Sequence, residues 1–179
     1  MNNNISSIHN LVKMSICTAI LCISAYISFP LPFAAALLTA LTITLNLIAF
    51  ILTPKQTFTV IILYLLLGTA GLPVFVGGMS GVSEILSPRG GFLLSFPFAY
   101  TCVSLCKGKN ISFTRYFSTA LFIGIPLTYL GGVLSVISYL NIDLYHALFI
   151  SVFPFLPGDI IKAFAAALLG VKINKILTY

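Results

Sequence analysis

The sequence predicts an all-helical (all-α) integral membrane protein with six transmembrane helices, on the basis of its composition, charge and hydropathy pattern. Hydrophobic residues make up 59% of the 179 residues, and the mean hydropathy is +1.12. Only 7% of the residues are charged, compared with about 25% in a typical soluble domain. The apolar residues also form runs close to the roughly 20 residues that a spanning helix needs. A single six-helix domain over residues 1–179 accounts for all three observations.

Three apolar runs follow a polar N-terminus. Residues 1–10, MNNNISSIHN, are expected to form a short, frayed tail. The first helix is predicted over residues 11–29 and ends at the sequence PLP, because proline lacks the N–H that a helix interior requires. The second is predicted over 33–52, ending at TPK, and the third over 57–72, ending at a glycine-rich segment.

Three more runs complete the predicted bundle. The fourth helix is predicted over residues 91–106 and ends at KGKN. The fifth covers 116–140, where a proline and a glycine pair interrupt the run and predict a kink. The segment 141–156 is expected to contain an interfacial helix. The sixth run covers 157–177, and Pro157 suits the first turn of a helix, where its missing N–H would be unpaired anyway.

The basic residues predict which ends of the helices face the cytoplasm. Six spans put both termini on one side, and seven of the nine basic residues fall on the termini and connections of that side. These are Lys13, Lys55, Lys107, Lys109, Arg115, Lys172 and Lys175. Because cytoplasmic connections are enriched in Lys and Arg, we expect a multi-pass protein with both termini in the cytoplasm. Topology also explains the net charge of +6, so nucleic-acid binding is not expected.

The remaining two cations, Arg89 and Lys162, fall on the outer side, where topology does not require them. Lys162 follows Asp159 by three residues at the start of the last run, in FPFLPGDIIKAFAAALLG, so both lie on one helix face. A helix cap with a lysine that snorkels to the interface is one interpretation. A ligand-binding pair is the other, because a charge at membrane depth usually faces a polar cavity.

The segment GLPVFVGGMSGVSEILSPRGG, residues 71–91, is called the glycine-rich loop below. It is longer than a connection requires and alternates glycine with apolar residues, so it is expected to fold against the helices as a lid. Gly77 and Gly78 would let its backbone approach a ligand closely. Arg89 and Glu84 supply its polar contacts. Alternatively, Arg89 is an anchor at the membrane interface or pairs with Glu84. For Glu84 the alternative is a solvated charge on the loop.

Together, two cations and one carboxylate on the outer side suit a small, partly apolar anion. No catalytic or metal-binding residues are expected, because the chain has three acids in all and lacks metal-ligand spacing and a phosphate-binding loop. Its four cysteines fall inside apolar runs and are interpreted as packing residues. A small-residue face on the first helix predicts either internal packing or docking of another membrane subunit. Its residues are Ser15, Thr18, Ala19 and Cys22.

Three stretches, LYLLLGTAGLPVFVGG, SPRGGFLLSF and FLPGDIIKAFAAALLG, resemble the biotin-specific substrate-binding subunits (S components) of energy-coupling factor (ECF) transporters. The resemblance extends over nearly the whole chain. It implies a six-helix subunit of the bacterial cytoplasmic membrane, surrounded by membrane lipid, that binds biotin from outside without a cofactor. It implies that Asp159 and Lys162 line the pocket, and that the loop carrying Arg89 covers the ligand. The partners implied are a transmembrane coupling protein (T component) and two ABC-type ATPases.

The resemblance leaves some expectations open. Tyr64 and Phe75 are expected as pocket walls, and which cation meets which end of biotin is undecided. The chain reads PFAAAL where relatives often have polar residues, and its first helix lacks the family's alanine-xxx-alanine docking signature. Two alternative functions remain. The same fold could bind another small vitamin or anion, or the chain could serve as a structural membrane subunit. The chain is not expected to be an enzyme, so any ATP hydrolysis would reside in separate subunits.

Overall fold

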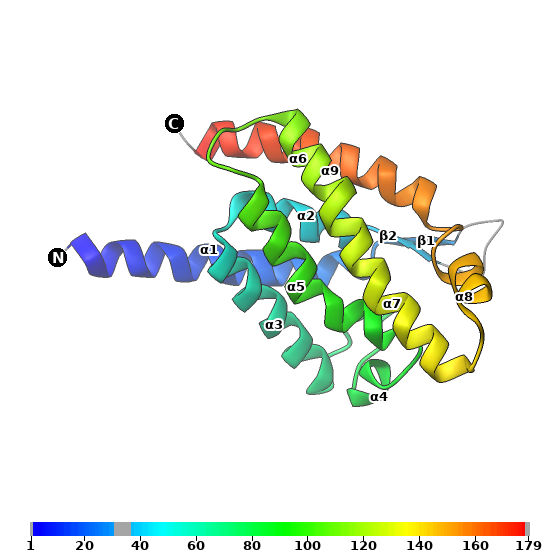
Figure 1. The fold of residues 1–179 in the computed structure, drawn as a ribbon. Helices are drawn as coiled ribbons and strands as arrows, with labels where there is room; N and C mark the ends of the chain where they lie inside the picture. The colour runs from blue at the N-terminus through cyan, green and yellow to red at the C-terminus, as the bar shows by residue number, and fades with distance from the viewer. Residues whose placement is uncertain (1, 31–36, 178–179) are drawn as a thin grey trace.

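A computed structural model describes residues 2–30 and 37–177, which are predominantly helical (Figure 1). The longer helices are α1 (Asn2–Ser24), α2 (Leu41–Ile51), α3 (Pro54–Thr69), α5 (Gly90–Cys106), α7 (Ile125–Leu140) and α9 (Leu156–Leu177). The shorter ones are α4 (Val82–Ile85), α6 (Phe113–Thr119), the π-helical turn η1 (Ala120–Gly124) and α8 (Leu144–Ser151). A two-stranded antiparallel hairpin pairs β1 (Ser28–Pro30) with β2 (Leu37–Thr39).

The N-terminal helix is longer at its start than the sequence suggests. Helix α1 begins at Asn2, so the expectation of a frayed tail over residues 1–10 is wrong. Once a helix has formed, each added residue gains a backbone hydrogen bond, and this propagation outweighs the weak helix preference of Asn and Ser. The first turns of α1 project beyond the other helices (Figure 1).

The second predicted helix, over residues 33–52, is also corrected. Its described N-terminal part is strand β2, and only α2, with 11 residues, is helical. At 1.5 Å per residue such a helix rises about 16 Å, roughly half the thickness of the hydrocarbon core. Strand β1 ends at Pro30. Proline has no backbone N–H to donate in a helix, so it is better suited to an extended conformation at the end of a strand. Residues 31–36, which contain the PLPF and AAA sequences, lie outside the described part.

The fifth run forms one uninterrupted helix over Phe113–Leu140, of 28 residues. Near Pro126, where a kink was expected, the helix contains the π-helical turn η1. This wider turn accommodates the proline ring and the backbone hydrogen bond that proline cannot make. Of the described helices this is the one that alone is long and apolar enough to cross a membrane. Helices α8 and α9 pass the same criterion together but meet at an angle of 52°. Three shorter segments, Ile8–Ser24, Leu41–Ile51 and Gly90–Cys106, are apolar without reaching that length.

Helices α5 and α7 cross at close range because both carry small residues where they meet. The positions are Gly91 and Ser95 on α5, and Gly131 and Ser135 on α7, each pair four residues apart. A Cβ atom built on Gly91 would lie 2.1 Å from the carbonyl oxygen of Gly131. Ser95 Oγ also donates a 3.3 Å hydrogen bond to the carbonyl of Thr128 on α7. This small-xxx-small pattern lets the two backbones touch.

The C-terminal end of α2 is held by side chains from three other parts of the chain. Lys107 Nζ donates to the carbonyl oxygens of Ala49 at 2.8 Å and Phe50 at 2.9 Å, and also to that of Leu52. Ser104, Lys13 and Asn174 donate to carbonyls of the same turn. The last carbonyls of a helix have no partner within it and carry partial negative charge, so a lysine suits this position. These contacts tie α2 to α1, α5 and α9.

Replacing Lys107 is therefore expected to destabilise the fold. We expect Lys107→Met to lower the free energy of unfolding by about 2 kcal/mol, because buried carbonyls lose a charged donor. Lys109→Met, two residues along the chain and exposed, is the matched control and is expected to have little effect. Denaturant titration in detergent at pH 7 measures both. This pH lies below the pKa of Lys107, which burial, together with the neighbouring Lys13, lowers to about 8. Equal losses in the two variants would contradict this role.

Candidate ligand-binding site

Asp159 and Lys162 lie together near the start of α9. Asp159 Oδ1 is 2.6 Å from Lys162 Nζ, and the side chains are 12% and 8% exposed, respectively. The spacing of three residues places them on one helix face, and Asp159 occupies the first turn, where the helix dipole favours a carboxylate. Lys162 is therefore buried in an ion pair, which differs from the snorkelling lysine considered as the alternative.

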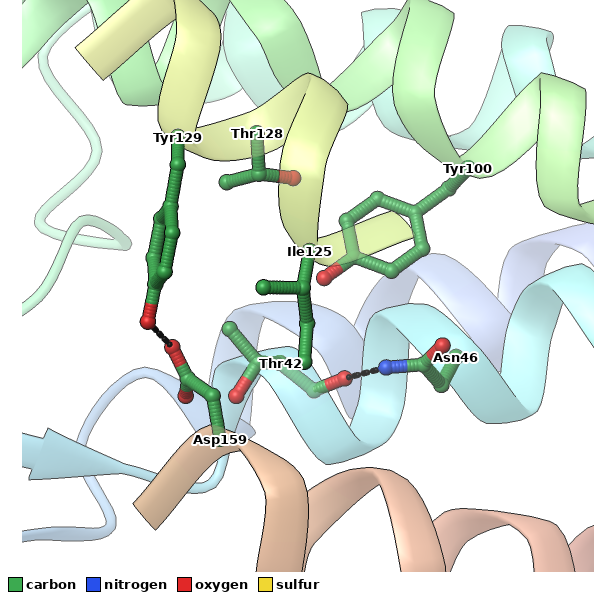
Figure 2. A pocket seen from close by; sticks show the side chains of 7 residues that line it. All are labelled: Thr42, Asn46, Tyr100, Ile125, Thr128, Tyr129 and Asp159. Carbon is green, nitrogen blue, oxygen red and sulfur yellow. Dashed lines mark hydrogen bonds between the residues drawn. The ribbon is translucent and has the colours of Figure 1, made fainter. Parts of the chain in front are cut away.

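The second oxygen of Asp159 is bound from α7. Tyr129 Oη donates a 2.6 Å hydrogen bond to Asp159 Oδ2, and Figure 2 shows the tyrosine ring reaching down from α7 to the carboxylate. A hydrogen bond of this length to an ionised acceptor is among the stronger ones in proteins. The carboxylate thus has a cation on one oxygen and a hydroxyl on the other.

A small polar cavity of about 10 Å³ adjoins Asp159. It lies where α2, α5, α7 and α9 meet, and Figure 2 shows the lining side chains converging from these four helices. They are Thr42, Asn46, Tyr100, Ile125, Thr128, Tyr129 and Asp159. This space is just large enough to hold about one water molecule. Six of the seven side chains carry a hydrogen-bonding group, which is an unusual concentration among apolar helices.

Helix α2 presents unpaired hydrogen-bonding atoms to this cavity. Asn46 Nδ2 donates to the carbonyl of Thr42 at 2.8 Å. Asn46 Oδ1 and Thr42 Oγ1 are buried and have no hydrogen-bond partner within the described residues. An unsatisfied buried polar group costs roughly 1–3 kcal/mol. A ligand that hydrogen-bonds to these atoms would recover that free energy, so the cavity is suited to a polar guest.

The predicted wall residues Tyr64 and Phe75 lie in the core, away from the cavity lining. Phe75 inserts from the glycine-rich loop between α3 residues, with its ring centroid 5.7 Å from that of Tyr64. Both side chains are fully or almost fully buried. Gly68 makes room for Phe75, because a Cβ there would lie 2.2 Å from the ring. Phe75 thus anchors the loop on α3. Its role as a ligand contact stays a prediction.

The other predicted loop residues form turns around this anchor. Gly77 and Gly78 have φ angles of 78° and 75° and reverse the chain between Phe75 and Met79, which pair as an isolated β-bridge. Gly81 N–H donates a 2.8 Å hydrogen bond to the carbonyl of Gly68. The loop is therefore folded against α3, as expected for a lid. The lining of the cavity includes none of its residues.

Arg89 and Glu84 lie on the outer part of the loop. Arg89 immediately precedes α5, is exposed, and its Nη1 approaches Met79 Sδ at 3.9 Å. Glu84 lies in α4 and is half-buried. The ion pairs found in the described part of the chain are Asp159–Lys162 and Asp143–His146, so the alternative of an Arg89–Glu84 pair is not present. Neither residue lines the cavity.

The small-residue face of α1 is divided between the core and the surface. Thr18 is buried and Cys22 is half-buried, so internal packing accounts for them. Ser15 and Ala19 are exposed, beside large apolar side chains such as Ile16 and Ile23. The exposed part of α1 remains available to another membrane subunit, and docking there stays a prediction.

Sequence reasoning missed the cavity residues contributed by α2, α5 and α7. The signal that was available is polarity within apolar runs: Asn46 is the only amide in the second run, and the hydroxyls of Tyr100 and Tyr129 fall inside the fourth and fifth runs. Polar side chains inside membrane segments usually face the bundle interior. Their convergence on Asp159 depends on helix packing, which no local pattern specifies.

Comparison with known proteins relates the whole chain to one family. A sequence model of the BioY family matches residues 1–179. The probable biotin transporter BioY of Bacillus subtilis (strain 168) is 31% identical over 172 residues, which cover 94% of this chain and 92% of the relative. The biotin transporter BioY of Thermotoga maritima is 31% identical over 166 residues, covering 93% and 96%. The biotin transporter BioY2 of Lactococcus lactis subsp. cremoris is 30% identical over 178 residues, covering 97% and 94%.

The fold is similar to that of a solved structure. This is a 2.1 Å crystal structure described as the S-component for biotin from an ECF-type ABC transporter, with a TM-score of 0.85 over 98% of this chain and 95% of that one. At 23% identity the similarity is one of fold. The family match over all 179 residues, with relatives of 31% identity across more than nine-tenths of the chain, shows that this chain belongs to the BioY family.

Proposed function

We propose that this chain is the substrate-binding S component of an energy-coupling factor importer and binds biotin with high affinity for uptake across the bacterial cytoplasmic membrane. The observation that carries the proposal is the buried group formed by Tyr129, Asp159 and Lys162 beside a polar cavity. The names of the BioY relatives, which describe them as biotin transporters, support the choice of ligand.

Biotin offers groups that match those of the cavity. Its ureido ring has two N–H donors and a carbonyl acceptor, and its valerate chain ends in a carboxylate. In this proposal Asp159 accepts ureido N–H groups and Asn46 and Thr42 bond to the same polar ring. Lys162 already pairs with Asp159, so the exposed Arg89 is the outer-side cation assigned to the ligand's carboxylate. The thioether and alkyl parts pack on apolar loop residues.

Binding requires the cavity to open. A volume of about 10 Å³ is far below the roughly 300–1,000 Å³ of typical ligand pockets. The side chains that must move are the tyrosines, because Tyr129 holds one Asp159 oxygen and Tyr100 forms the opposite wall. We propose that a ureido N–H takes the place of the Tyr129 hydroxyl on Asp159, and that the glycine-rich loop then closes over the ligand.

The proposed topology has six spans. Five of them are single helices: α1, α3, α5, the α6–α7 helix and α9. The sixth consists of the β1–β2 segment together with α2. The start of α1, the end of α9, and the α2–α3 and α5–α6 connections lie at one end of the bundle, which we propose is cytoplasmic (Figure 1). Those positions carry most of the basic residues. In this proposal the exposed face of α1 docks a transmembrane coupling protein, and two ABC-type ATPases hydrolyse ATP.

Uptake of radiolabelled biotin tests this function. Bacterial cells without their own biotin transport are given this chain, with and without coupling subunits, and accumulation is followed in the presence of excess unlabelled vitamins. We expect unlabelled biotin to suppress accumulation, and thiamine or riboflavin to leave it unchanged. Suppression by another vitamin but not by biotin would transfer the assignment to that vitamin.

Asn46→Leu is expected to separate binding from stability. Biotin affinity should fall about tenfold, because a hydrogen-bonding partner is lost in a desolvated site. Stability of the free protein should change little, because the substitution removes a buried oxygen that has no partner in the described part of the chain but also the Asn46 Nδ2 hydrogen bond to the Thr42 carbonyl, and these two effects oppose each other. Titration with biotin and thermal unfolding measure the two effects. Asn110→Leu, the same change at an exposed position, is the control. Unchanged affinity would exclude Asn46 from the site.

A further inference from the structure

A second, larger hollow lies on the side of the molecule between the start of α3 and the end of α5. This lipid groove, as it is called below, has a volume of about 490 Å³. Its lining residues are Pro54, Lys55, Phe58, Thr59, Thr101 and Leu105. Phe58 packs edge-on against Phe98, with centroids 6.3 Å apart, and extends the apolar surface along α5. The lipid groove shares none of its residues with the cavity beside Asp159.

The lipid groove combines one cation with an apolar wall. Lys55 is exposed in the first turn of α3, and no ion pair or hydrogen bond of its ammonium is present among the described residues. Phe58 and Leu105, at 39% and 63% exposure, form the apolar part. The occupant that suits these groups has an anionic head and a hydrocarbon tail.

The acidic side chains lie far from Lys55. The chain has three of them, Glu84, Asp143 and Asp159, all within the described residues. They belong to α4, the start of α8 and the start of α9, and these elements lie at the end of the bundle opposite the α2–α3 connection (Figure 1). Among the described side chains, the end that carries Lys55 therefore holds basic groups without acidic ones, so an anion from another molecule would find a complementary charge there.

We propose that the lipid groove is a binding site for an anionic phospholipid. Its phosphate pairs with Lys55, and an acyl chain lies along Phe58 and Leu105. Anionic headgroups attract basic residues at the membrane surface with roughly 1 kcal/mol per residue. The proposal depends on the membrane location given above but not on the identity of the transported ligand.

Native mass spectrometry of the detergent-purified full chain tests the site, with phosphatidylglycerol and phosphatidylcholine of matched chain length as probes. We expect retention of one phosphatidylglycerol per chain and weaker retention of phosphatidylcholine. Lys55→Gln should weaken phosphatidylglycerol retention about fivefold, whereas Lys55→Arg should preserve it. Lys109→Gln, at an exposed position on the connection after α5, is the matched control and should behave as the unmodified chain.

Two results would overturn the lipid site: equal retention in Lys55→Gln and the unmodified chain, or equal retention of the two lipids. Biotin binding is measured on the same samples and is expected to be unchanged in Lys55→Gln. A chain that retains phosphatidylglycerol selectively but does not bind biotin would leave the lipid site intact and contradict only the proposed function.

Discussion

Asp159→Asn is expected to weaken biotin binding by about 100-fold or more. The substitution keeps the size of the side chain but replaces one acceptor oxygen with an NH₂ donor, which would face the ureido N–H groups of the ligand. It also leaves the Lys162 ammonium, 8% exposed, without its counter-charge. A site built around hydrogen bonds to a polar ligand loses affinity steeply when one partner is removed, since the other groups remain buried and unpaired.

Asp143→Asn is the matched control for this experiment. Asp143 immediately precedes α8, is exposed and pairs with His146, so it bears the same charge outside the site. We expect it to bind biotin as the unmodified chain does. Calorimetric titration of both variants in detergent measures the difference, and thermal unfolding shows that each is folded. Similar affinities for Asp159→Asn and Asp143→Asn would remove Asp159 from the binding site.

Gly91→Ala is expected to destabilise the protein by about 3 kcal/mol. The added methyl group would lie 2.1 Å from the carbonyl oxygen of Gly131 and 2.4 Å from Ser135 Cβ, so α5 and α7 must separate. Overpacking of this kind typically costs 1–3 kcal/mol. The sign of the change in stability is informative, because alanine is intrinsically a better helix former than glycine by about 1 kcal/mol and would otherwise stabilise α5. A net loss of stability therefore reports on the helix crossing alone.

Leu134→Ala provides the control on α7. Its side chain is 59% exposed, so its truncation should change the free energy of unfolding little. Equilibrium unfolding in mixed detergent micelles compares the two variants. Because Tyr100 on α5 and Thr128 on α7 line the cavity, Gly91→Ala should also weaken biotin binding. A stabilised Gly91→Ala protein would show that the two helices are not packed as described.

The sequence predicted the helical class and most helix positions from apolar length and terminating residues. The runs at 57–72, 91–106 and 157–177 correspond to α3, α5 and α9 within a few residues. The run at 33–52 failed as a helix, because hydropathy alone does not distinguish the strand β2 from the helical α2 that follows it. The prediction of a frayed tail was wrong because polar residues with weak helix propensity still extend a helix that has already formed.

For the candidate site, too, local features could be predicted and long-range contacts could not. Asp159 and Lys162 could be predicted together because their spacing within one helix is a local property. Tyr129 and Asn46 could not, because their positions against Asp159 depend on how α7 and α2 pack on α9. Phe75 lies against Tyr64 and Gly68, a packing contact that the sequence did not indicate, and its contact with the ligand stays a prediction. Long-range packing is the information that local patterns lack.

Equilibrium binding of biotin to the detergent-purified chain, alone and without coupling subunits, tests the central claim most directly. The account predicts saturable binding of one biotin per chain, strongly weakened in Lys162→Ala, which leaves the buried Asp159 carboxylate without its cation. Thiamine and riboflavin, added at the same concentrations, should not compete. A folded, unmodified chain that shows no saturable biotin binding would contradict the assignment of the Asp159 cavity as a biotin site.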